Sequence, residues 1–69
     1  MPVITVETWE GRTVEQKRRL AAAITDAMVE HFQSNPERTY VLIYDIPKQN
    51  WARGGILSSD EEAAEQQAK

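Results

Sequence analysis

The fold of this chain is decided by one apolar stretch, Tyr40-Val41-Leu42-Ile43-Tyr44. The stretch lies inside a predicted strand over residues 39–46 and is apolar on both faces, as in strands that are covered on two sides. One helix can cover only one face of a sheet. The sequence therefore predicts that a second subunit covers the other face.

A strand and a long helix are predicted before this stretch. Residues 2–8 alternate as a strand does. The run Thr13-Val14-Glu15-Gln16 has the form of a capping box, with Thr as N-cap and Gln three residues later. Apolar residues recur at helical spacing after it, so a helix is expected to extend to near Phe32, before Pro36 prevents its continuation.

The predicted helix has two faces of different character. Its apolar side is expected to pack on the sheet, with His31 as a packed side chain at the edge, and its polar side is expected to face solvent. The apolar positions are Leu20, Ile24, Ala27, Met28, His31 and Phe32. The polar positions include Lys17, Arg18, Asp26 and Glu30.

These elements predict an α+β fold. Strand, helix and strand in this order form a βαβ unit with parallel strands and a right-handed crossover. Residues 51–57 are expected to form a short hairpin, because Gly54 and Gly55 permit positive φ. We expect a small two-layer βαβ domain over residues 1–60, completed by oligomerisation. An acidic C-terminal tail over residues 61–69 is expected to be either a loose helix or a disordered end.

The composition limits the chemistry. The 69 residues include no Cys and one His, which excludes disulfides and a Cys nucleophile and argues against a metal site. A chain of this size seldom builds a sufficient core, so oligomerisation is expected to stabilise it. No targeting segment is recognised and no apolar run is long enough for a bilayer, so a cytoplasmic protein without a membrane partner is expected.

The charge is unevenly distributed. The formal net charge is −3, and Asp60, Glu61, Glu62 and Glu65 against Lys69 account for all of it. The remaining residues are neutral overall, which is unlike the basic surface of a nucleic-acid binder. Arginine makes up most of the bases of this neutral part, and its planar fork suits carboxylates, so a small acidic ligand is a plausible partner.

Pro2 follows the initiator methionine directly. Methionine is generally removed before a small residue, which would leave proline as a free secondary amine. An α-amino group has a pKa of about 8, and burial beside cations lowers it toward neutrality, the range that suits a general base. Considered alone, however, Met1-Pro2 is better explained as the start of an edge strand.

The order of these features resembles the 4-oxalocrotonate tautomerase family. Met-Pro precedes a strand, the turn Glu10-Gly11-Arg12-Thr13 leads into the helix, and Asn50-Trp51-Ala52-Arg53-Gly54-Gly55 follows the second strand. The resemblance covers about residues 2–60. It implies a proline-dependent keto–enol tautomerase that needs no cofactor. It also implies a hexamer, a trimer of dimers, acting on a small anionic organic acid.

The resemblance assigns roles to individual residues. The family's N-terminal proline base corresponds to Pro2, its carboxylate-binding arginine to Arg12, and its aromatic wall, usually Phe, to Trp51. The family's second arginine is replaced by Tyr40. Arg38, expected on the same strand face as Tyr40, and Arg53 in the glycine loop are the candidates for that missing cation, and Tyr40 itself can donate a hydrogen bond.

Two other functions remain open at this point. A hydratase or dehalogenase on the same scaffold would use a protonated Pro2 and a carboxylate that activates water, for which Glu7, Glu10 and Asp45 are candidates. A catalytically inert assembly protein would be favoured by retention of Met1, because the amide nitrogen of Pro2 is then no base. The sequence does not distinguish identical subunits from pairing with a related chain.

Overall fold

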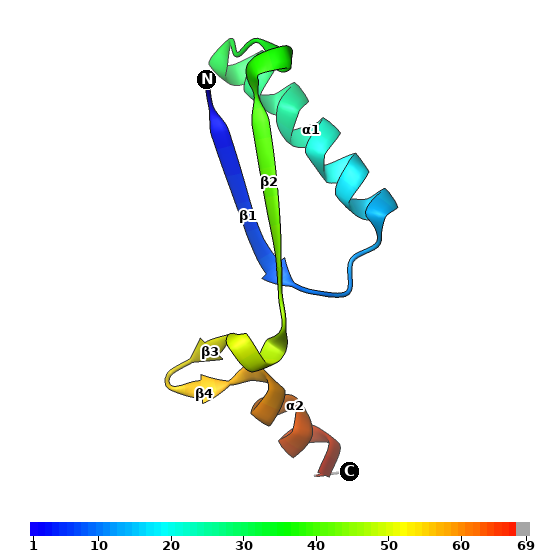
Figure 1. Ribbon diagram of the computed structural model, residues 1–69, viewed down its shortest axis with the longest axis vertical. Coiled ribbons are helices and arrows are strands. Elements are labelled where there is room, and N and C mark those ends of the chain that lie inside the picture. Colours follow the sequence, from blue (N-terminus) through cyan, green and yellow to red (C-terminus); the bar gives the residue numbers. More distant parts are fainter. Residues whose placement is uncertain (68–69) are drawn as a thin grey trace.

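The computed structural model describes residues 1–67, and the predicted βαβ unit is confirmed (Figure 1). Strand β1 spans Val3–Trp9, helix α1 spans Val14–Phe32 and strand β2 spans Tyr40–Ile46. The two strands pair in parallel along their whole length. The first residues of both strands therefore lie at one end of the sheet, and the last residues of both lie at the other.

Helix α1 begins as the sequence predicts. The Thr13 hydroxyl accepts a hydrogen bond from the Gln16 backbone N–H at 3.1 Å, and the Gln16 side chain accepts from the Thr13 N–H at 2.9 Å. This reciprocal pair is the expected capping box, and it satisfies two backbone donors that a helix start leaves free. The helix ends at Gln33, which adopts the left-handed conformation with φ 52°.

Two turns complete the βαβ unit. Gly11 has φ 123°, so the turn into α1 uses a conformation that other residues rarely adopt. The 3₁₀ turn η1, Pro36–Arg38, precedes β2 and is capped by Asn35, whose side chain accepts from the Glu37 N–H at 3.0 Å. The second strand consequently begins at Tyr40, one residue later than predicted.

The chain beyond β2 forms a separate lobe at the far end of the sheet (Figure 1). It contains the 3₁₀ turn η2 (Lys48–Asn50), the predicted hairpin of β3 (Ala52–Arg53) with β4 (Ile56–Leu57), and helix α2 (Ser58–Gln67). Of the two alternatives for the tail, the structure adopts the helix. The helix runs through the predicted boundary at residues 60 and 61, and residues 68–69 of that tail lie outside the described residues.

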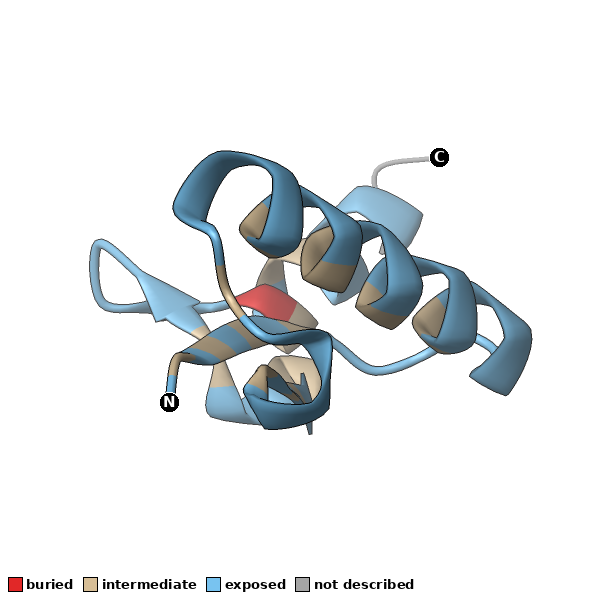
Figure 2. Ribbon diagram, turned by 90° about the horizontal axis from the view of Figure 1, so that it is seen from above, coloured by how far each residue is buried: buried red, intermediate tan, exposed pale blue. Residues whose placement is uncertain are grey.

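Only one face of the sheet is covered within the chain. Helix α1 packs on one side of the strand pair (Figure 2), and exposure alternates along both strands. The side chains toward the helix are half-buried, while Tyr40, Leu42 and Tyr44 on the open face are exposed. The expectation that β2 is covered on two sides is therefore met on one side only within a single chain.

The helix packs less completely than predicted. Ile24 and Met28 are half-buried as expected, but Phe32 is exposed and the His31 side chain is 75% exposed. The expectation that His31 packs is wrong for the single chain. Helix α1 is longer than strand β2, so the last turn of the helix, which contains His31, extends beyond the strand. Lys17, expected in solvent, instead folds toward the sheet and pairs with Asp45.

A single chain has no hydrophobic core. Among the described residues no apolar side chain is fully buried, and Ser58 is the one buried residue (Figure 2). The radius of gyration is 16.3 Å, whereas a compact domain of this length has about 11 Å. None of the helices in residues 1–67 is long and apolar enough to cross a membrane.

Candidate active site

The Pro2 end of the sheet combines two of the predicted site residues. The Tyr40 backbone N–H donates a hydrogen bond to the Pro2 carbonyl at 3.0 Å, which fixes Pro2 beside the start of β2. Pro2 is half-buried, while Met1 before it is 83% exposed. Val3 pairs with Tyr40 and both are exposed, so the Tyr40 ring lies on the open face and Pro2 on the opposite one.

Arg38 lies near this end but not where the strand alternation predicted. It belongs to η1, where its N–H donates to the Asn35 carbonyl at 3.0 Å. The expectation that Arg38 shares a strand face with Tyr40 is wrong, because Asn35 and Pro36 start a turn that continues through Arg38. Its exposed guanidinium is placed by the turn rather than by the sheet.

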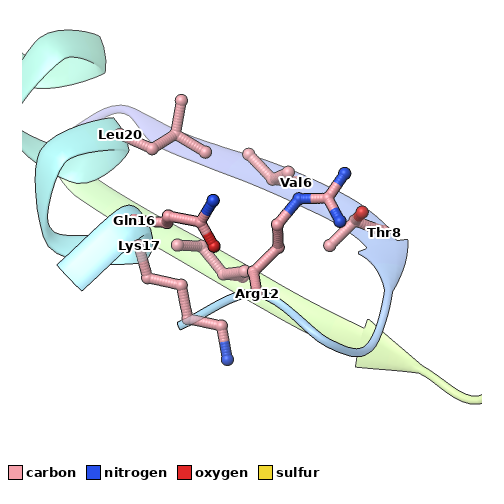
Figure 3. A pocket seen from close by; sticks show the side chains of 7 residues that line it. Val6, Thr8, Arg12, Gln16, Lys17 and Leu20 are labelled. Atoms are coloured by element: carbon pink, nitrogen blue, oxygen red, sulfur yellow. The ribbon is translucent and has the colours of Figure 1, made fainter. Parts of the chain in front are cut away.

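Arg12 lies at the other end of the sheet, where it lines a pocket of about 160 Å³ between α1 and the strands (Figure 3). The side chain reaches back from the turn toward Thr8 and Val6. The remaining lining residues are Gln16, Lys17, Leu20 and Ile43. The pocket has an apolar floor and cationic groups at its edge, so it suits an organic anion.

The ammonium of Lys17 forms an ion pair with the Asp45 carboxylate. This pair leaves Arg12 as the guanidinium that lines the pocket. It also ties Asp45 to a partner, which argues against Asp45 as the water-activating carboxylate. Glu7 is exposed on the open face, opposite to Pro2, and Glu10 is exposed in the turn.

Trp51 and Arg53 come together in the far lobe. They line a second pocket, of about 130 Å³, with Trp9, Ser58 and Glu61. The Trp51 and Trp9 rings are 6.0 Å apart between centroids and meet edge to face at 72°. Trp9 comes from the end of β1, so the aromatic wall is made by two elements.

The predicted site residues therefore form two groups in one chain. Pro2 and Tyr40 lie at the first end of the parallel strands, on opposite faces of the sheet, and Arg12, Trp51 and Arg53 lie at the second end. The strands have seven residues each, which corresponds to a separation of about 20 Å. One small substrate cannot touch both groups of the same chain.

The comparisons with known proteins agree with one another. The family model described as "Tautomerase enzyme" matches residues 2–61. A 2-hydroxymuconate tautomerase from Bacillus subtilis is 40% identical over 90% of this chain and all of its own length. The solved structure of a 4-oxalocrotonate tautomerase isozyme from Methylibium petroleiphilum is 36% identical, with a TM-score of 0.86 over 91% of this chain and 98% of that one.

The chain belongs to the 4-oxalocrotonate tautomerase family. It is an enzyme, an isomerase of the tautomerase type. A heterohexameric 4-oxalocrotonate tautomerase from Chloroflexus aurantiacus also shares the fold, at 30% identity and a TM-score of 0.80, over 87% of this chain and 97% of that one. That relative is a heterohexamer.

Two residues of this tautomerase were missed by sequence reasoning. Trp9 was not among the predicted site residues, yet its ring meets the Trp51 ring edge to face beside the second pocket. Glu61 was assigned to the acidic tail, yet it lines the same pocket as Arg53. The position of Trp9, an aromatic residue at the end of the first strand, was a signal that could have identified it. Nothing in the sequence indicated that Glu61 lies beside this pocket.

Proposed function

We propose that this protein is a cofactor-independent keto–enol tautomerase acting on an unsaturated 2-oxo acid, with the amine of Pro2 as its general base. The observation that carries the proposal is the placement of Pro2. It is half-buried and held at the start of the sheet by its own carbonyl. Its nitrogen is therefore free for proton transfer once Met1 is removed, and the exposure of Met1 makes that removal possible.

The reaction needs a proton carrier and a cation. The neutral Pro2 amine takes the proton of the enol hydroxyl, and the resulting dienolate carries its negative charge on the oxygen atoms. The same amine, now protonated, returns the proton to a carbon atom, which completes the isomerisation. A guanidinium such as Arg12 stabilises the developing charge, and Trp51 excludes water, which strengthens that interaction.

We further propose that the working unit is a hexamer of this chain. The open sheet face carries exposed Tyr40, Leu42 and Tyr44, and the chain has no core of its own. A second copy that covers this face supplies the missing layer. Assembly also offers a way to join Pro2 of one chain with Arg12 and Trp51 of another, because one chain keeps them apart.

Mass spectrometry and a pH profile together test the assignment. The intact mass is expected to lack Met1. The value of kcat/KM for ketonisation of phenylenolpyruvate is expected to fall as pH drops through the pKa of the Pro2 amine, because the protonated amine is no base. A retained Met1 in active enzyme contradicts the proposal. Activity on a haloacrylate that requires protonated Pro2 supports the hydratase or dehalogenase instead.

The tyrosine at position 40 is expected to change substrate preference. Loss of one bidentate, charge-assisted contact costs about 1.5–3 kcal/mol, or roughly tenfold to a hundredfold in kcat/KM. We therefore expect a monocarboxylate to be preferred over a dicarboxylate such as 2-hydroxymuconate. Tyr40→Arg should raise kcat/KM selectively for the dicarboxylate, and Tyr40→Phe, the matched control, should not. Equal gains on both acids would contradict this role.

A further inference from the structure

The pocket beside Trp51 has features that the reaction itself does not require. It is lined by two indole rings together with Arg53, Ser58 and Glu61. The wall is thus aromatic, and one cationic and one anionic side chain stand at the same hollow. The pocket of about 130 Å³ is close to the roughly 150 Å³ that admits a benzene ring in a protein interior.

Helix α2 is anchored so that Glu61 faces this pocket. The Ser58 N–H donates to the Trp51 carbonyl at 2.8 Å, and Ser58 is only 7% exposed. One turn further, Glu62 pairs with the Lys48 ammonium at 2.8 Å. These contacts hold the first turn of α2 at two residues, Ser58 before Glu61 in the sequence and Glu62 after it.

The ammonium of Lys48, which lies near the Trp9 ring, is engaged outside the pocket. Lys48 holds Glu62 and also lies 4.8 Å from the centroid of the Trp9 ring. Within residues 1–67, neither Arg53 nor Glu61 forms an ion pair. Both charges are therefore available to a ligand in the hollow.

We propose that this pocket receives the far end of the substrate and that Glu61 selects its chemistry. An aromatic ring can pack against the tryptophan pair, a hydroxyl on that ring can donate to Glu61, and the charge of Glu61 opposes the attraction of Arg53 for a second carboxylate there. The preferred substrate is then an aryl-substituted 2-oxo acid that bears a hydrogen-bond donor. This inference rests on the proposed function, because it assumes that Trp51 borders the reacting molecule.

The test compares three arylpyruvate enols, unsubstituted, 4-hydroxy and 4-carboxy, in the intact enzyme. Glu61→Gln is expected to raise kcat/KM for the 4-carboxy compound about tenfold, since the like charge is removed. The gain should appear in KM, because the ring end is remote from the reacting carbon. The unsubstituted compound should change less than twofold. The matched control, Glu65→Gln, removes the same charge from an exposed position of the same helix outside the pocket.

A binding measurement separates this inference from the proposed function. The saturated 3-arylpropanoates with the same substituents cannot tautomerise, and calorimetry gives their affinities directly. If Glu61→Gln strengthens only the 4-carboxy ligand about tenfold while no enol is turned over, the pocket assignment holds and the proposed reaction fails. Equal effects of Glu61→Gln and Glu65→Gln, or none from either, overturn the assignment.

Discussion

Pro2→Ala is expected to lower kcat for enol ketonisation by about a hundredfold or more, the range attributed to a positioned general base. The variant retains an N-terminal amine after Met1 removal, but it is a primary amine with different basicity and without the ring that fixes its direction. The carbonyl that accepts from the Tyr40 N–H belongs to the backbone, so this hydrogen bond does not depend on the proline ring.

The measurement needs two controls. Intact mass must show that wild type and variant have both lost Met1, since a retained methionine blocks either amine. Circular dichroism must show the same helix content in both proteins, because a loss of folded structure would also lower kcat. An unchanged kcat under these conditions would remove Pro2 from the mechanism.

The fold was largely predictable because its signals are local. Three local features have the predicted geometry: the Thr13–Gln16 capping box, the glycine at position 11 and the Gly54-Gly55 pair. Each of them involves only residues that are close together in the sequence. The parallel pairing follows from the order of strand, helix and strand. Local patterns of this kind are readable in the sequence without any knowledge of tertiary contacts.

The errors arose where distant residues decide the outcome. Lys17 was placed in solvent by its helical position, but Asp45, 28 residues later, draws it to the sheet. Arg38 was placed on a strand face by alternation, but the turn started by Asn35 comes first. His31 was expected to pack, and its exposure reflects a helix longer than the strand pair it covers.

The candidate site was predictable as a set of residues but not as an arrangement. The resemblance names Pro2, Arg12 and Trp51 together, whereas the structure separates them along the sheet. No pattern within one chain indicates which residues meet across an interface. The chemistry of the site stays a prediction from the resemblance, and the parallel register of β1 and β2 is the reason why we propose that the site is shared between chains.

Mixing two inactive variants is expected to restore activity. Pro2→Ala lacks the base and Arg12→Ala lacks the carboxylate-binding cation, so each is expected to be nearly inactive alone. In a randomly mixed oligomer, a site that takes Pro2 from one chain and Arg12 from another keeps both with a probability of about one quarter. Dissociation and reassembly of an equal mixture should thus recover about a quarter of the wild-type rate.

The alternative arrangements give different results. If Pro2 and Arg12 of the same chain formed one site, every chain in the mixture would lack one of them and no activity would return. Each variant taken alone through the same procedure provides the control, and sedimentation must show that the mixture reassembles. A folded monomer at micromolar concentration would contradict the assembly itself. Neither variant gains any group that it lacked, so recovered activity must come from the way the chains combine. Because the strands put the backbone of Pro2 and that of the Arg12 turn about 20 Å apart, we expect the restored pair to come from two chains.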